Sequence, residues 1–162
     1  MYNQRVEQIL IDCDNELVKL QNLIANFGST HEASGYLTKY ALLKIASTLE
    51  ISYKTLIADH YKSLSPELSF FVSGRVHDAV MNATYDNINK MLGWFSDEVK
   101  KEYKQKVSSL PEKDRILAEF SDLNTARKNL VHYNFTTPSF TSIKEKYEHV
   151  KILLELLDDI LK

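Results

Sequence analysis

The segment Arg127–His132 combines two side chains that can act on a phosphate-containing substrate. A guanidinium fork matches the geometry of phosphate oxygens, and an imidazole exchanges protons near neutral pH. Arg127 also interrupts an apolar stripe, because Leu123 precedes it by one helical turn and Leu130 follows it by one. A charge is rarely buried without a partner. Arg127 is therefore expected either to pair with a buried acid or to face a groove between two bodies.

The spacing of Arg127 and His132 separates them on a continuous helix. Five residues advance about 7.5 Å along the axis and about 140° around it, so one helix does not aim both side chains at a single atom. Two copies meeting across a two-fold axis would each bring an arginine and a histidine to one cleft. Asn129 and Lys128 lie three and four residues before His132 and are expected to share its face.

Glu50 is the acid that best suits Arg127 as a partner. It lies in the middle of a helix expected from about Gly35 to Lys62, whose apolar positions cover much of its girth. The alternative is a glutamate at the flank of this helix that pairs with Lys54 four residues later. The sequence leaves both readings open.

Apolar residues recur at steps of three and four along most of the chain, and no useful length of strand-like alternation occurs. Cap residues and glycine or proline breaks divide this pattern into segments. The chain is predicted to be an all-α bundle of about six to seven helices in a single domain, residues 1–162. The expected helices run from about Asn3 to Asn26, Gly35 to Lys62, Pro66 to Asn82 with an interruption near Gly74, Ala83 to Phe95, Ser96 to Leu110, Glu112 to Tyr133 and Ser139 to Lys162.

Bulk composition limits the classes of function. The chain has 162 residues, 44% of them hydrophobic, which suits one domain with its own core. The formal net charge of -2 excludes a protein coated in basic charge, so any nucleic-acid contact must come from a local patch. With Cys13 as the one cysteine, no internal disulfide forms and a cytoplasmic setting is expected. No apolar signal core and no run of ~18 apolar residues is found, so no membrane partner is expected.

The remaining histidines give no metal-binding pattern. They are scattered without the spacing of metal ligands, and packed or surface roles are favoured for them. No metal and no cofactor are expected. These histidines are His31, His60, His77 and His149.

The arrangement resembles the HEPN superfamily, the higher eukaryotes and prokaryotes nucleotide-binding domains. These are small helical bundles whose late helix carries an arginine, four to six further residues and then a histidine, as Arg127 and His132 do here. The likeness covers about Gly35 to Lys162, with residues 1–28 as an added leading helix, and is greatest to stand-alone bacterial members of the ribonuclease-toxin kind. Further features that carry it are Leu49-Glu50-Ile51 in the central helix, Leu123-Asn124-Thr125-Ala126 before the motif, and Ser139-Phe140-Thr141 at the start of the last helix.

Two positions depart from the family pattern. Lys128 follows the arginine where a small polar residue is usual, and the asparagine is displaced to Asn129. Tyr133 directly follows the histidine, whereas members paired with a nucleotidyltransferase antitoxin often carry tyrosine two residues after it. Modification of such a tyrosine is therefore not carried over to this chain.

The resemblance implies a metal-independent endoribonuclease that works as a homodimer. His132 would take a proton from a ribose 2′-hydroxyl, and Arg127 would stabilise charge on the phosphoryl oxygens. Asn129 would orient the histidine or bind phosphate, and Lys128 would hold the RNA backbone. Glu50 and Tyr133 would support the site. The implied setting is toxin activity or antiviral defence, with an antitoxin or regulatory protein as a further partner.

A second reading of the same residues is a non-catalytic HEPN module that binds a nucleotide or a protein partner. Arg127 would then be structural and locked to Glu50, and His132 would be a helix-end residue favoured by the helix dipole. Lys128, in place of the usual small residue, favours this second reading.

Overall fold

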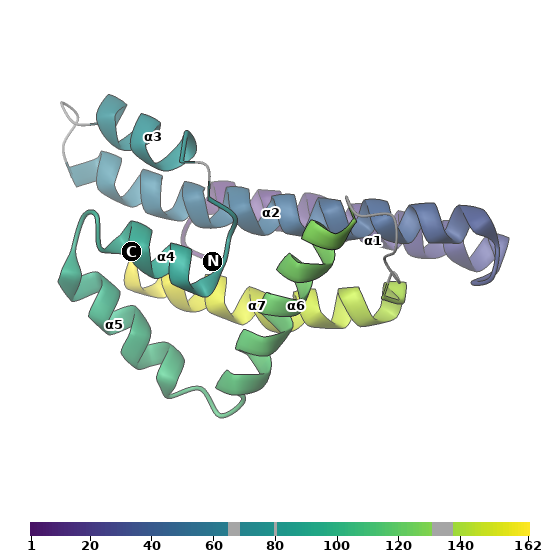
Figure 1. The fold of residues 1–162 in the computed structure, drawn as a ribbon. Helices are drawn as coiled ribbons and strands as arrows, with labels where there is room; N and C mark the ends of the chain where they lie inside the picture. Colours follow the sequence, from purple (N-terminus) through teal and green to yellow (C-terminus); the bar gives the residue numbers. More distant parts are fainter. Residues whose placement is uncertain (65–68, 80, 131–137) are drawn as a thin grey trace.

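The chain folds into an all-helical bundle (Figure 1), seen in a computed structural model that describes residues 1–64, 69–79, 81–130 and 138–162. Seven helices lie within these residues, and no strand is found among them, which confirms the predicted all-α class. The helices are α1 (Gln4–Phe27), α2 (Glu32–Leu64), α3 (Ser69–His77), α4 (Tyr85–Leu92), α5 (Asp97–Ser108), α6 (Lys113–Asn129) and α7 (Phe140–Ile160).

The first two helices form a long pair, side by side in Figure 1. Asn3 begins α1 as its cap, because its side chain accepts a hydrogen bond from the Val6 amide. Gly28 ends it at φ 87°, a left-handed conformation that glycine adopts without a Cβ penalty. The predicted apolar stripe of α1 is confirmed, with only Ile24 left half-buried. Its buried members are Val6, Leu10, Cys13, Leu17 and Leu20.

Helix α2 is central, as its two apolar stripes predicted. It packs against α1, α3, α4, α6 and α7. Burying so much of one helix removes a large apolar area from water, and each Å² of that area stabilises the fold by about 25 cal/mol. Its buried residues include Leu42, Ile45, Leu49, Tyr53 and Leu56.

The last two helices complete the side of the bundle that carries the motif. Figure 1 shows α7 running along the bundle and α6 crossing between α7 and α2. Ser139 caps α7 by accepting from the Ser142 amide. The two chain ends meet on the same side of the bundle, where the Tyr2 and Asn3 amides donate to the Asp158 carboxylate. Nowhere in the described ranges is a helix both long and apolar enough to cross a membrane.

Helix α3 corrects one sequence prediction. Gly74 lies inside α3, which continues to His77, so no interruption occurs at the glycine. Val72 and Val76 are buried on either side of it, and this packing outweighs the ~1 kcal/mol by which glycine disfavours a helix interior. The predicted start at Ser65-Pro66 lies outside the described residues.

The end of α6 corrects a second prediction. The helix ends at Asn129 with Leu130 as its C-cap, whereas it was expected to continue to about Tyr133. The 140° separation of Arg127 and His132 assumed one helix through both residues. That angle therefore no longer supports a shared two-fold site.

Candidate functional site

Arg127 reaches its place through the apolar face of α6. Ile116, Phe120 and Leu123 are buried on that face and fix the rotation of the helix against the bundle. Arg127 and Lys128 lie in the last turn, where positive side chains are favoured by the exposed carbonyls of the helix end. The helix thus directs Arg127 toward α2 at a position where the stripe calls for an apolar residue.

The prediction that Arg127 is partly buried beside Glu50 is confirmed. Its Nη1 atom lies 3.1 Å from Glu50 Oε2 on α2. The same nitrogen donates to Asn82 Oδ1 at 3.2 Å. The Arg127 side chain remains 32% exposed and that of Glu50 23% exposed. Arg127 is therefore anchored from two directions and still reaches the surface.

Both readings of Glu50 hold at once. Its other carboxylate oxygen, Oε1, accepts from Lys54 Nζ at 3.0 Å, one turn along α2. Lys54 is buried and its Nζ also donates to the carbonyl of Ala79 at 2.8 Å. Glu50 therefore joins two cations, and the group of Glu50, Lys54 and Arg127 carries one net positive charge. We call these three residues together with Asn82 the Glu50 cluster.

The segment between α3 and α4 completes the cluster, and sequence reasoning missed its part. Asn82 accepts from Arg127, and the next residue, Ala83, accepts at its carbonyl from Asn124 Nδ2 at 2.7 Å. Asn82 lies 45 positions before Arg127 and outside any helix, although the sequence predicted a helix that continues to it from Pro66. Only the packing of α3 and α4 brings it there, so no local signal marked it.

The cluster has the chemistry of an anion site. Both hydrogen bonds of Arg127 to described residues use Nη1, and a third of the side chain is exposed. Nη2 and Nε make no hydrogen bond to a residue that the structure describes, and the planar fork of a guanidinium matches the geometry of a phosphate. Because Glu50 already pairs with Lys54, its charge is shared and Arg127 keeps part of its positive field.

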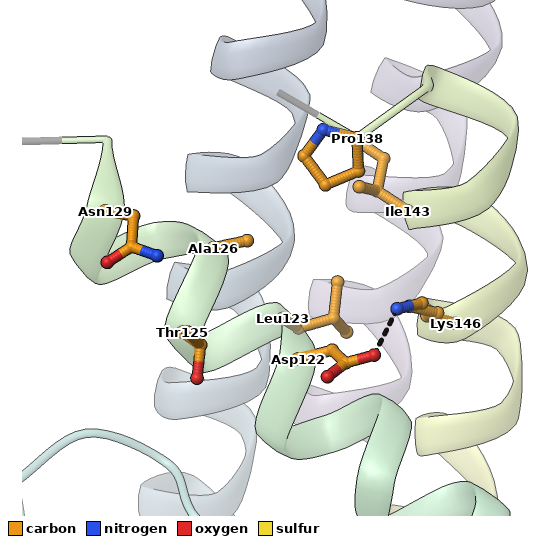
Figure 2. Close-up of a pocket in the computed structure, with 8 residues that line it drawn as sticks. All are labelled: Asp122, Leu123, Thr125, Ala126, Asn129, Pro138, Ile143 and Lys146. Carbon is orange, nitrogen blue, oxygen red and sulfur yellow. Dashed lines mark hydrogen bonds and ion pairs between the residues drawn. The ribbon is translucent and has the colours of Figure 1, made fainter. Parts of the chain in front are cut away.

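The structure separates the other predicted site residues around α6. Lys128 is exposed and lines a cavity beside the start of α4. Asn129 lines a second pocket, of about 190 Å³, between α6 and α7. Figure 2 shows this pocket, with the Asp122–Lys146 ion pair joining the two helices below Asn129. Successive residues of a helix point about 100° apart, so Lys128 and Asn129 face different neighbours from Arg127, and no described hydrogen bond joins either of them to the Glu50 cluster.

His132 and Tyr133 lie outside the described residues, so their positions relative to Arg127 are not part of the site described here. Within residues 1–64, 69–79, 81–130 and 138–162, no three His, Cys, Asp or Glu side chains gather in a group that would hold a metal ion.

Searches of this chain against protein-family models, curated proteins and solved structures gave no match.

Proposed function

We propose that this chain is a metal-independent endoribonuclease of the HEPN kind. The observation that carries the proposal is Arg127, which is held by Glu50 and Asn82 while 32% of its side chain stays exposed. A purely structural ion pair has no need of this exposure. An anchored and partly exposed cation can stabilise the charge that develops on phosphate oxygens during cleavage, and a histidine follows it by five residues.

In the proposed reaction His132 acts as the general base. It takes the proton of a ribose 2′-hydroxyl, and the 2′-oxygen forms a bond to the adjacent phosphorus. The bond from phosphorus to the 5′-oxygen breaks, and that oxygen receives a proton from a protonated histidine, His132 of a second copy. Arg127 stabilises the charge on the non-bridging oxygens. The products are a 2′,3′-cyclic phosphate and a free 5′-hydroxyl.

A homodimer is part of the proposal, and an apolar strip on α2 supports it. Tyr36, Tyr40 and Leu43 follow one another at helical spacing and are 62%, 44% and 47% exposed. Ile51, next to Glu50, is 48% exposed. These exposed apolar side chains share one face of α2, and exposed apolar patches mark association surfaces. A second copy on this strip would lie beside the Glu50 cluster.

The decisive test is cleavage of mixed RNA by the purified full-length chain in EDTA. We expect cleavage to persist, fragments to end in 2′,3′-cyclic phosphate, and His132→Ala to abolish the activity. His31→Ala is the matched control, because His31 is exposed at the start of α2 and should leave cleavage unchanged. An absolute requirement for added Mg²⁺ would contradict the proposal.

The dimer has its own test. Light scattering should give twice the chain mass of 18.7 kDa. If one site draws residues from both copies, mixing Arg127→Ala with His132→Ala chains should restore part of the activity. An active monomer in dilute solution would refute the dimer and leave the ribonuclease proposal standing.

The second candidate is a non-catalytic HEPN module that binds a nucleotide or a protein partner. The Glu50 cluster is also consistent with this candidate, because a structural arginine would make the same ion pair with Glu50. Under this alternative the wild-type chain does not cleave RNA, and Arg127→Ala lowers only the stability of the fold.

A further inference from the structure

A cavity of about 360 Å³ lies on the side of α6 that carries Lys128. It is bounded by the first residues of α4 and by one face of α6, and its size falls within the ~300–1,000 Å³ of small-ligand sites. Lys128 belongs to the lining, whereas Arg127 points away toward α2. The cavity is therefore separate from the Glu50 cluster but begins one residue from it.

The lining is suited to a flat polar group. Tyr85 contributes an aromatic ring, which packs against the buried Tyr103 ring at 5.9 Å between centroids and is held in place by it. Ser121 and Thr125 add hydroxyl groups that both donate and accept hydrogen bonds. Aromatic faces stack on bases of any sequence, and hydroxyl groups satisfy their polar edges.

The lining of the cavity carries charge of both signs. Lys128 attracts a phosphate, whereas the Asp86 carboxylate repels one. Asp86 instead accepts hydrogen bonds from an exocyclic amino group, the contact that carboxylates make with cytosine. A nucleotide would fit with its base toward Asp86 and its phosphate toward Lys128.

The segment 82–84 links this cavity to Arg127. Asn82 accepts from Arg127, the Ala83 carbonyl accepts from Asn124 of the cavity wall, and Thr84 lines the cavity while capping α4. Three consecutive residues thus connect Arg127 to the lining of the cavity. A chain that laid its phosphate on Arg127 would place a neighbouring base at this opening.

We infer that this cavity binds the base of a nucleotide next to the scissile phosphate and prefers bases with an exocyclic amino group. The inference rests on the proposed ribonuclease function and adds a substrate preference to it. Cytosine, adenine and guanine are expected to bind more tightly than uracil.

The experiment uses 2′-O-methyl dinucleotides, which lack the attacking hydroxyl and so report binding without cleavage. Four of them, differing only in the 5′ base, are titrated into the full-length protein and followed by the amide signals of α6. We expect uracil to bind about tenfold more weakly than the other bases, because one hydrogen bond to the Asp86 carboxylate is lost. Asp86→Asn should remove this preference.

Ser121→Leu should weaken every dinucleotide at least about tenfold, because leucine fills the cavity at an exposed helix position that tolerates it. Ala118→Leu is the matched control, since Ala118 is exposed on the same helix outside the cavity lining. If the wild-type chain cleaves RNA but the Ser121→Leu variant keeps its affinity for the dinucleotides and its base preference, the inference about the cavity is wrong. The proposed ribonuclease function would still stand. A wild-type chain that shows the preference but does not cleave RNA would remove the proposed function and leave the base-binding cavity.

Discussion

Two carboxylates inside this bundle illustrate how differently a buried acid can be used. Asp158 on α7 is 4% exposed, and both of its oxygens accept from backbone amides, those of Tyr2 and Asn3. Glu50 on α2 accepts instead from two charged side chains, Lys54 and Arg127, and its side chain is 23% exposed. Asp158 closes a structural contact between the chain ends, whereas Glu50 holds a cation that remains accessible.

The difference extends to the surroundings of each acid. Asp158 lies on α7, the helix that also buries Tyr147, and Tyr53 and Tyr103 are buried elsewhere in the bundle interior. The interior around these three rings is closed to water. The Glu50 cluster opens to the surface at the end of α6. We therefore expect changes in the closed region to alter stability and changes in the open region to alter activity.

The largest expected effect lies in the closed region and depends on pH. Burial raises the pKa of Tyr53, Tyr103 and Tyr147 above about 10, the value of tyrosine in an unfolded chain. The folded protein keeps protons that the unfolded chain releases, so stability is retained below pH ~10 and falls as pH rises beyond it. The slope is up to about 1.4 kcal/mol per pH unit for each tyrosine. Urea unfolding between pH 8 and 11 measures it, and Tyr147→Phe should make the slope shallower.

Under the proposed function, Arg127→Ala should lower RNA cleavage by about 10²–10³-fold, because it removes the cation proposed to stabilise the phosphoryl oxygens. Its effect on the free energy of unfolding should stay within about 1 kcal/mol, as for other partly exposed ion pairs, since Glu50 keeps Lys54 as a partner. Cleavage rates in EDTA and urea midpoints measure the two effects. A large loss of stability with unchanged cleavage would mean that the Glu50 cluster serves the fold and not the activity, and would favour a structural role for Arg127.

Asp158→Ala should lower the free energy of unfolding by about 1–3 kcal/mol, because the amides of Tyr2 and Asn3 lose their acceptors. Cleavage per folded molecule should not change. Asp159→Ala is the control, because that neighbouring carboxylate is exposed and pairs with Lys106 and Lys162 at the surface. Equal losses of unfolding free energy in the two variants would mean that the burial of Asp158 does not determine its contribution to stability.

The smallest expected effect is that of Asn82→Ala, which removes one of the two anchors of Arg127. One lost hydrogen bond of about 1 kcal/mol lowers cleavage about fivefold. Asn82→Asp keeps an oxygen acceptor at the same position and should restore most of the activity. If both variants cleave at the wild-type rate, Glu50 alone is sufficient to orient the arginine.

The sequence by itself determined most of the helices and indicated Glu50 as the leading partner for Arg127. Repeats of three and four predicted α1, α2, α5 and α7 nearly to their ends, since apolar spacing and capping residues act locally. Arg127 stands on an apolar stripe, and a buried charge needs a partner. The sequence therefore indicated Glu50, 77 positions away, as that partner.

Only the tertiary structure decided where the motif helix ends and what surrounds its arginine. Helix α6 ends at Asn129, before the predicted limit, and Asn82 reaches Arg127 through the packing of α3 and α4. The placement of Lys128 and Asn129 in two different pockets also depends on which neighbours pack beside α6. A contact between distant segments is set by how whole helices pack together, and the periodicity of one helix carries no information about the loop that packs across its end.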